Sequence, residues 1–272
     1  MPEDDRELEL NRELELVVTY MKGHWPSAVK PEWQVDVAEY PEIVKKVVAD
    51  LTVGASRGKQ LIRVAGISGS GKTTQILPAV EAYSSVREMV PVLVAARVFV
   101  KYHPHYAEIL DYYGKKDLRK MTDEFATIML FLVLSALIRG GYDIVLDVTL
   151  LDPEMEGILV KLLGGGGYKM LLLMVAVSPV VTEKFLAGRE WRHTAETEQE
   201  FVRATSEALK FYAKAMPKGR VVMWSVYDLT PVYDGKMAGC LETFEKYSSR
   251  TEMPSPNDDE RREAKIKYLT SY

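Results

Sequence analysis

The sequence predicts an α/β protein with a parallel sheet of about five strands and helices on both faces of that sheet. Between residues 61 and 226, short and nearly continuous apolar runs alternate with longer segments of helical periodicity. Strands that are apolar throughout are typical of a parallel sheet that helices bury on both sides. Hydrophobic residues make up 47% of the 272 residues, which is enough to form a substantial core.

Composition excludes several classes of protein. The net charge of -4 and the 27% of charged residues fit neither a disordered acidic chain nor a basic nucleic-acid binder. The single cysteine, Cys240, excludes an intramolecular disulfide framework and a multi-cysteine metal site. The acidic N-terminus has no apolar run behind it, and the apolar stretch 125–138 is too short to span a bilayer. We therefore expect a cytoplasmic protein without a membrane or nucleic-acid partner.

The N-terminal part is predicted to be helical and separate from the sheet. Residues 4–22 carry apolar side chains at helical spacing without glycine or proline, and residues 24–41 form a proline-containing irregular connection. Pro41 then begins a helix that runs to Val53 and ends at Gly54. We expect residues 1–38 to be a helical extension, residues 39–250 the main domain and residues 251–272 a polar tail.

The main domain alternates between strands and helices in chain order. Apolar, β-branched runs predict strands, and longer periodic segments predict helices, the first of which is interrupted by Pro78. The glycines at 164–167 are interpreted as a helix cap and not as a phosphate loop. The predicted strands are 61–65, 90–96, 142–147, 169–177 and 220–226, and the predicted helices are 72–86, 103–113, 116–139, 153–163, 179–192 and 196–215.

One motif carries a specific chemical prediction. Residues 66–73 read Gly-Ile-Ser-Gly-Ser-Gly-Lys-Thr and match G-x-x-x-x-G-K-[ST] between a predicted strand and a predicted helix. In such a P-loop the backbone amides face the phosphates, the lysine neutralises the β/γ charge, and the hydroxyl of Thr73 binds magnesium. The motif predicts a P-loop NTPase or kinase fold that uses ATP and Mg²⁺. The predicted nucleotide-binding residues are Gly66, Ser68, Gly69, Ser70, Gly71, Lys72, Thr73 and Thr74.

An acidic residue at the end of a neighbouring strand completes many P-loop sites, because it holds the magnesium or acts on the acceptor. Asp147, which follows an apolar run, is the candidate here, and the alternative is a carboxylate that caps a turn. Asp152 precedes Pro153 and is interpreted as the N-cap of the next helix.

Phosphoryl transfer also needs positive charge on a segment that can close over the nucleotide. Arg189 and Arg192 are predicted to supply it, although a solvated helix face has the same pattern. A lid around residues 186–200 would exclude water as a competing acceptor, which is a requirement of a kinase more than of a switch protein.

Two further segments resemble the zeta-toxin family of P-loop kinases. Residues 99–106 (Phe-Val-Lys-Tyr-His-Pro-His-Tyr) are similar to the family's F-x-x-x-H-P segment, and residues 141–149 (Gly-Tyr-Asp-Ile-Val-Leu-Asp-Val-Thr) to its G-Y-x-hydrophobic-E-G-T segment. Residues 167–179 resemble the family's fourth strand. The similarity covers residues 40–179 well and the arginine-bearing segment loosely.

The resemblance implies an ATP- and magnesium-dependent kinase. In the best-known members the acceptor is a UDP-N-acetylamino sugar, so a nucleotide sugar such as UDP-N-acetylglucosamine is the expected small-molecule acceptor, and an antitoxin is a conceivable protein partner. By the same resemblance Asp147 replaces the family's strand-end glutamate, and Thr149 falls on its threonine. Arg189 and Arg192 fall near its two catalytic arginines, which join Lys72 and Asp147 as the predicted catalytic set. The predicted acceptor-binding residues are Arg97, His103 and Thr149.

One departure from the family bears on activity. The family places its catalytic aspartate two residues before the phenylalanine, where this sequence has Arg97. Arginine stays protonated and cannot accept a proton from the acceptor. Either Asp147 takes over, or the acceptor differs, or activity on the family substrate is lost; Arg97 would then be available to bind an anionic group of the acceptor. The rival to a kinase is therefore a degenerate nucleotide-binding or NTPase module with a regulatory role.

Overall fold

The computed structural model describes residues 18–19, 28–66, 72–148, 163, 166–176 and 221–228. The chain divides into two compact units, one formed by residues 1–55 and 92–142 and the other by residues 56–91 and 143–272. The predicted helices at 4–22 and 153–163 are described only at residues 18, 19 and 163, all of which are helical. The predicted helices at 179–192 and 196–215 and the tail lie outside the described residues.

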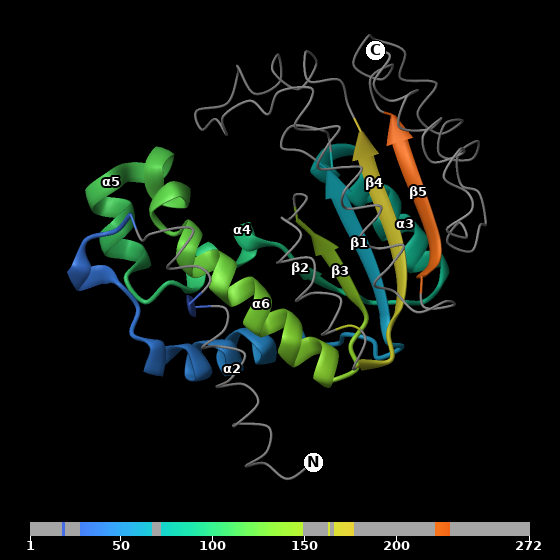
Figure 1. Ribbon diagram of the computed structural model, residues 1–272, viewed down its shortest axis with the longest axis horizontal. Coiled ribbons are helices and arrows are strands. Elements are labelled where there is room, and N and C mark those ends of the chain that lie inside the picture. Colours follow the sequence, from blue (N-terminus) through green and yellow to red (C-terminus); the bar gives the residue numbers. More distant parts are fainter. Residues whose placement is uncertain are drawn as a thin grey trace. The chain divides into compact units, whose positions relative to one another are not determined.

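The second unit contains the parallel sheet that the sequence predicts. Its strands are β1 (Gln60–Gly66), β3 (Ile144–Asp147), β4 (Lys169–Ala176) and β5 (Val221–Asp228), and they lie in the order β3-β1-β4-β5 (Figure 1). Each neighbouring pair is parallel, with Val64 of β1 opposite Asp147 of β3 and Gly66 opposite Val175 of β4. The α/β fold class is confirmed. Each of the five predicted strands is found: four belong to this unit, and the remaining one, β2, belongs to the other unit.

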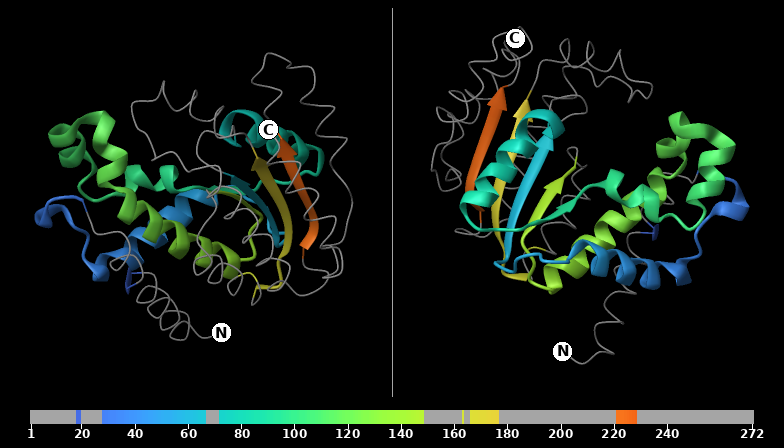
Figure 2. Two further views of the ribbon diagram at one scale, coloured as in Figure 1. Left: turned by 45° about the horizontal axis from the view of Figure 1, so that its top comes forward. Right: turned by 180° about the vertical axis from the view of Figure 1, so that it is seen from behind.

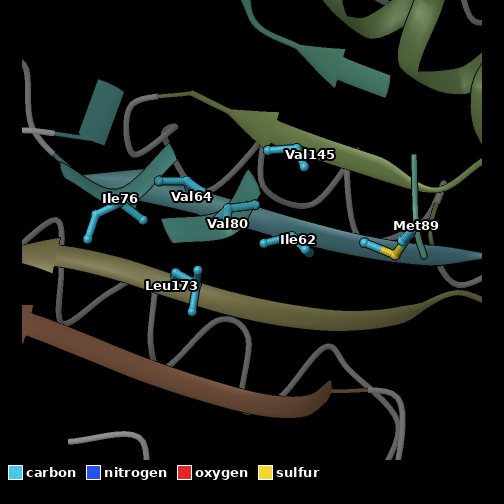
Figure 3. Packing of buried hydrophobic residues seen from close by; sticks show 7 residues of the cluster. All are labelled: Ile62, Val64, Ile76, Val80, Met89, Val145 and Leu173. Atoms are coloured by element: carbon cyan, nitrogen blue, oxygen red, sulfur yellow. The ribbon is translucent and has the colours of Figure 1, made fainter. Parts of the chain in front are cut away.

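One face of this sheet packs against helix α3 (Leu77–Val86), which Figure 2 shows from behind. Side chains alternate across a strand, so every second residue of β1 points to this face. The core on this face contains the buried residues Ile62, Val64, Ile76, Val80, Met89, Val145 and Leu173 (Figure 3). Because neighbours in register point to the same side, the apolar runs of β1, β3 and β4 form one continuous buried surface.

The helix that follows the P-loop is interrupted, as Pro78 predicts, but the interruption lies upstream of the proline. Residues Lys72–Ile76 form a π-helical turn, η3, and α3 begins only at Leu77. Proline has no N–H to donate to the carbonyl of Thr74, four residues earlier, and its ring clashes with that carbonyl in an α-helix. A wider π turn avoids this clash at the position where the motif's lysine begins the helix.

A buried carboxylate ties together three backbone segments at the amino end of the sheet. Asp143 is 2% exposed, and its carboxylate accepts hydrogen bonds from Ser56 Oγ at 2.6 Å and from Gln60 N at 2.9 Å. Ser56 Oγ in turn accepts from Val90 N at 3.0 Å. A Cβ at Gly58 would lie 2.8 Å from Asp143 Oδ1, so the chain passes this carboxylate at a glycine.

The first unit is mainly helical. Its long helices are α2 (Tyr40–Leu51), α5 (Tyr106–Met121) and α6 (Asp123–Arg139), and α2 packs beside α6. The apolar composition of α6 predicts a buried helix, and most of its residues between Phe125 and Ile138 are buried. The shorter elements are the 3₁₀ turns η1 (Pro31–Trp33), η2 (Val37–Glu39) and η4 (Val100–Tyr102), the strand β2 (Val92–Val94) and the helix α4 (Ala96–Phe99).

The structure corrects two predicted boundaries in this unit. The strand predicted at 90–96 is the three-residue β2, because Ala96 already begins α4. The helices predicted at 103–113 and 116–139 separate at Thr122, whose Oγ1 donates to Leu118 O at 2.9 Å. The break expected at Gly114 is a kink inside α5, since this glycine has φ 79° and ψ 166°.

Within the described ranges, no single helix combines the length and the apolar composition needed to cross a bilayer. The pair α5 and α6 reaches both together, but the two helices are bent by 50° at their junction.

Candidate nucleotide site

The lysine of the P-loop motif lies at the point where the chain enters η3 from the glycine-rich turn. Lys72 is half-buried, and its Nζ donates a hydrogen bond to Gly66 O, the first glycine of the motif, at 2.7 Å. The ammonium group therefore reaches back to the last residue of β1. A phosphate that entered the loop would meet a positive charge there, together with the amides of the helix start.

The rest of the motif is only partly described. Thr73 is exposed, and the backbone of Thr74 lies in η3. The predicted nucleotide contacts of Ser68, Gly69, Ser70 and Gly71 lie outside the described residues and stay predictions.

Asp147 ends β3, the strand next to β1. It is in register with Val64, two residues before Gly66, and Val148 N donates to Val64 O at 3.4 Å. Because register partners share a face, the Asp147 side chain lies on the α3 side of the sheet, as Val64 does. It is 4% exposed. Asp147 and the P-loop thus lie at the carboxyl edge of adjacent parallel strands, where ligands of such sheets bind.

The donor set at this edge matches a hard cation. The hydroxyl of Thr73 and the carboxylate of Asp147 are oxygen donors, and Mg²⁺ takes one or two such donors together with phosphate oxygens and water. Among the described residues there is no cluster of three or more His, Cys, Asp and Glu side chains placed to hold a metal.

Two of the predicted acceptor-binding residues belong to the other unit. Arg97 lies in α4 and is exposed, and His103 follows η4. Thr149, Arg189 and Arg192 lie outside the described residues. Their roles, and that of Arg97, stay predictions.

His103 is a packed histidine. Its side chain is 4% exposed, its ring lies edge-on to Phe125 at 4.6 Å between centroids, and its Nδ1 accepts from His105 N at 3.2 Å. Phe125 in turn stacks on Tyr40. The pKa of His103 is lowered to about 4, mainly by burial and in addition by the neighbouring His105, while Glu108 acts in the opposite direction. The fold thus favours the neutral ring, which can accept the hydrogen bond from the backbone.

This low pKa predicts a pH-dependent stability. The unfolded chain, with a histidine pKa near 6.5, binds more protons than the folded chain between about pH 6.5 and about pH 4. The stabilisation is complete above pH 6.5 and is lost as the pH falls toward 4, so the free energy of unfolding should drop by about 2 kcal/mol between about pH 7.5 and about pH 5. Urea unfolding at both pH values measures it. In His103→Asn, which keeps an acceptor for His105 N, this part of the pH dependence should disappear; equal slopes in both proteins would contradict it.

Comparison with known proteins identifies the family of this chain. The family model described as Zeta toxin matches residues 47–227, a range that includes the P-loop, Arg97 and Asp147. This chain belongs to the Zeta toxin family. The predicted family is thereby confirmed, and with it a kinase-like P-loop fold of a nucleotide-binding family.

Two relatives of this Zeta toxin family member come from Streptococcus pneumoniae. The chain is 28% identical over 145 residues to the toxin PezT of serotype 4, an alignment that covers 52% of this chain and 55% of PezT. The chain thus spans about half the length of that curated relative. A solved structure from the PezAT chromosomal toxin–antitoxin system is 18% identical with a TM-score of 0.56, and the match covers 88% of this chain and 98% of that chain. At this identity the structural match supports the fold alone.

Proposed function

We propose that this member of the Zeta toxin family transfers the γ-phosphate of ATP to a hydroxyl group of a small molecule. The observation that carries the proposal is the arrangement at the carboxyl edge of the sheet. Lys72 Nζ donates a hydrogen bond to Gly66 O at the start of the helical segment that follows the P-loop motif. Asp147 ends the neighbouring strand, with its side chain on the α3 face of the sheet. A cation and a carboxylate at this edge are the two charges that phosphoryl transfer to an alcohol requires.

In this mechanism Lys72 neutralises charge that develops on the β- and γ-phosphates. Thr73 and Asp147 would hold Mg²⁺, which would supply positive charge to the phosphates of a bound nucleotide. Asp147 is also the group that would accept the proton of the attacking hydroxyl, since Arg97 occupies the family's aspartate position and cannot do so. Arg189 and Arg192 would add positive charge around the transferring group and help to exclude water.

The acceptor we favour is a nucleotide sugar such as UDP-N-acetylglucosamine. The diphosphate of such a molecule is anionic, and a guanidinium group binds phosphate oxygens in a bidentate geometry. Arg97 would then bind the acceptor, and His103 and Thr149 are the other acceptor-binding residues that the family resemblance implies. The substitution at position 97 would alter the proton acceptor and not the class of substrate.

Arg97 also favours a second candidate function, a regulatory module that binds nucleotide and hydrolyses it slowly or not at all. A site without a proton acceptor would still bind ATP through the P-loop, because binding and transfer depend on different groups.

The relatives suggest a protein partner. The solved structure belongs to a toxin–antitoxin system. We propose that an antitoxin protein binds this chain and holds the kinase inactive.

The experiment that separates the two functions is a screen with radiolabelled ATP and magnesium over nucleotide sugars, nucleosides, sugars and antibiotics. A labelled acceptor identifies a kinase and names its substrate class. ATP binding without any labelled acceptor would favour the regulatory module. Labelled inorganic phosphate in every reaction, with no labelled acceptor, would indicate hydrolysis.

Asp147→Asn tests the carboxylate without changing the size of the side chain. We expect the rate of phosphoryl transfer to fall on the order of 100-fold, because the amide can neither accept a proton nor hold magnesium with a negative charge. ATP binding without magnesium should change little, since the P-loop remains intact. Single-turnover rates and equilibrium binding separate the two effects. An unaltered rate would remove Asp147 from the mechanism.

A further inference from the structure

Three aromatic rings and a lysine meet in the first unit, in a region that the proposed reaction does not use. Lys30 Nζ lies 3.5 Å from the ring centroid of Tyr112 and 4.7 Å from that of Trp33. Both distances are within the range of about 6 Å over which a cation is attracted to an aromatic face. The ammonium group therefore lies between two rings.

The rings form the walls of a corner. Trp33 and Tyr112 have centroids 5.4 Å apart at an interplanar angle of 68°, and Tyr113 meets Tyr112 edge-on at 4.9 Å and 80°. Tyr113 also meets Trp33, at 5.9 Å and 77°. The Lys30 ammonium faces two of these rings, Trp33 and Tyr112, and Tyr113 flanks both of them. Aromatic rings that meet at steep angles beside a cation are the geometry by which proteins recognise alkylammonium groups.

The backbone holds both sides of this corner. Lys30 and Trp33 belong to one tight turn, in which Pro31 fixes the backbone and Trp33 N donates to Lys30 O at 2.9 Å. Tyr112 and Tyr113 come from helix α5. The segment is anchored beside them, because the buried Val29 packs in one cluster with Ile109 and Leu118 of α5. The corner is thus built by the fold and does not depend on the lysine side chain alone.

The corner is open to solvent on one side. Tyr112 is 60% exposed, whereas Trp33 and Tyr113 are partly buried. In the described part of the chain, no acidic side chain lies within ion-pair distance of the Lys30 ammonium. The attraction that holds the cation comes from the rings, and an external cation can reach the same rings from the Tyr112 side.

We propose that Trp33, Tyr112 and Tyr113 form a binding site for an alkylammonium group, which Lys30 of the same chain occupies in the free protein. Lys30 acts as an intramolecular competitor that an external ammonium group displaces. The ligand belongs to the class of quaternary or methylated ammonium compounds, whose larger apolar surface fits an aromatic corner better than a strongly hydrated primary ammonium does.

The test uses tetramethylammonium chloride, titrated against sodium chloride at equal ionic strength, with the Trp33 indole signal followed by NMR and assigned with Trp33→Phe. Lys30→Ala empties the corner, so it should bind the probe about threefold more tightly than the wild type or better, since the competing lysine is held at a high effective concentration. Tyr112→Ala in the Lys30→Ala background should abolish the saturable shift. Lys30→Gln is a second emptied variant should the alanine destabilise the turn.

Lys101 provides the matched control, because its Nζ lies 5.0 Å from the single ring of Tyr102. Lys101→Ala should leave binding of the probe unchanged. A second arm uses a short neutral peptide containing trimethyl-lysine: tighter binding than tetramethylammonium assigns the site to a protein side chain, and equal binding assigns it to a small organic cation. No saturable shift in either emptied variant, or an equal shift after removal of Tyr112, would overturn the proposal and leave a packing contact.

Discussion

Replacing Lys72 with alanine is expected to reduce phosphoryl transfer from ATP on the order of 1000-fold and to weaken ATP binding with it. Lys72 Nζ lies 2.7 Å from the carbonyl oxygen of Gly66, the first residue of the P-loop motif. Removing one charged donor that faces developing charge in a water-poor site typically costs 100-fold to 1000-fold, at about 3 to 4 kcal/mol. Because a P-loop lysine contacts nucleotide in the ground state as well as in the transition state, we expect both binding and rate to fall.

Two measurements test this expectation. Equilibrium binding of ATP gives the first effect, and single-turnover transfer to the acceptor found in the screen gives the second. ATP should also raise the melting temperature of the wild type and not that of Lys72→Ala, because a ligand that binds only the folded state stabilises it. Full ATP affinity together with full turnover in Lys72→Ala would remove the P-loop from the function.

Lys169→Ala is the matched control. Lys169 is exposed and begins β4, at the opposite end of the strand from the carboxyl edge that carries the P-loop.

The loss of the Lys72–Gly66 hydrogen bond itself should change the free energy of unfolding by only about 1 kcal/mol. A large loss of activity with normal folding therefore separates a missing charge from a damaged loop.

The P-loop and the sheet could be predicted because both depend on local patterns. The backbone geometry of a P-loop requires the residue types of the motif. A short, nearly continuous apolar run such as that of β1 is typical of a strand that is buried on both faces. The position of Asp147 at the carboxyl end of its strand follows from the apolar run that precedes it. The family resemblance, based on residues 99–106 and 141–149, was confirmed by the match over residues 47–227.

The boundaries were harder to predict where two apolar elements adjoin. Residues 92–99 are apolar apart from Arg97, so periodicity does not distinguish the end of β2 from the start of the short helix α4. The π turn at Lys72 lies upstream of Pro78, at the carbonyl side of the backbone bond that the proline cannot form, and the Thr122 junction depends on a side-chain hydrogen bond to Leu118 O. The Lys30 corner could not be predicted, because Trp33 meets α5 residues far away in the sequence.

The buried carboxylate of Asp143 is a further case. Asp143 lies in the run 142–147, which the sequence predicts to be a strand, whereas β3 begins only at Ile144. The signal was present, since a carboxylate inside an apolar run must find hydrogen-bond donors once it is buried. Which donors it finds depends on how the chain returns to the amino end of the sheet, through Ser56 and Gln60.

Asp143→Ala is therefore expected to lower the free energy of unfolding by about 3 kcal/mol. The substitution leaves Ser56 Oγ and Gln60 N without their acceptor in a buried place, and each hydrogen bond to a charged group contributes about 1.5 to 3 kcal/mol. Relief from burying the carboxylate offsets part of the sum. Urea unfolding measures the change, and Ser56→Ala, which removes one of the two donors, should cost less.

A substitution at Gly58 provides a second test, because it distinguishes the hydrogen bonds of the Asp143 carboxylate from the space that this carboxylate occupies. In the wild type, Gly58→Ala should cost about 1 to 3 kcal/mol, since the new Cβ would lie 2.8 Å from Asp143 Oδ1 and would push the carboxylate off its donors. In Asp143→Ala that oxygen is absent, so the same change at Gly58 should cost little. The double-mutant cycle should then give a coupling of about 1 kcal/mol or more. Additive effects would mean that Gly58 responds to its own backbone and that Asp143 does not organise this end of the sheet.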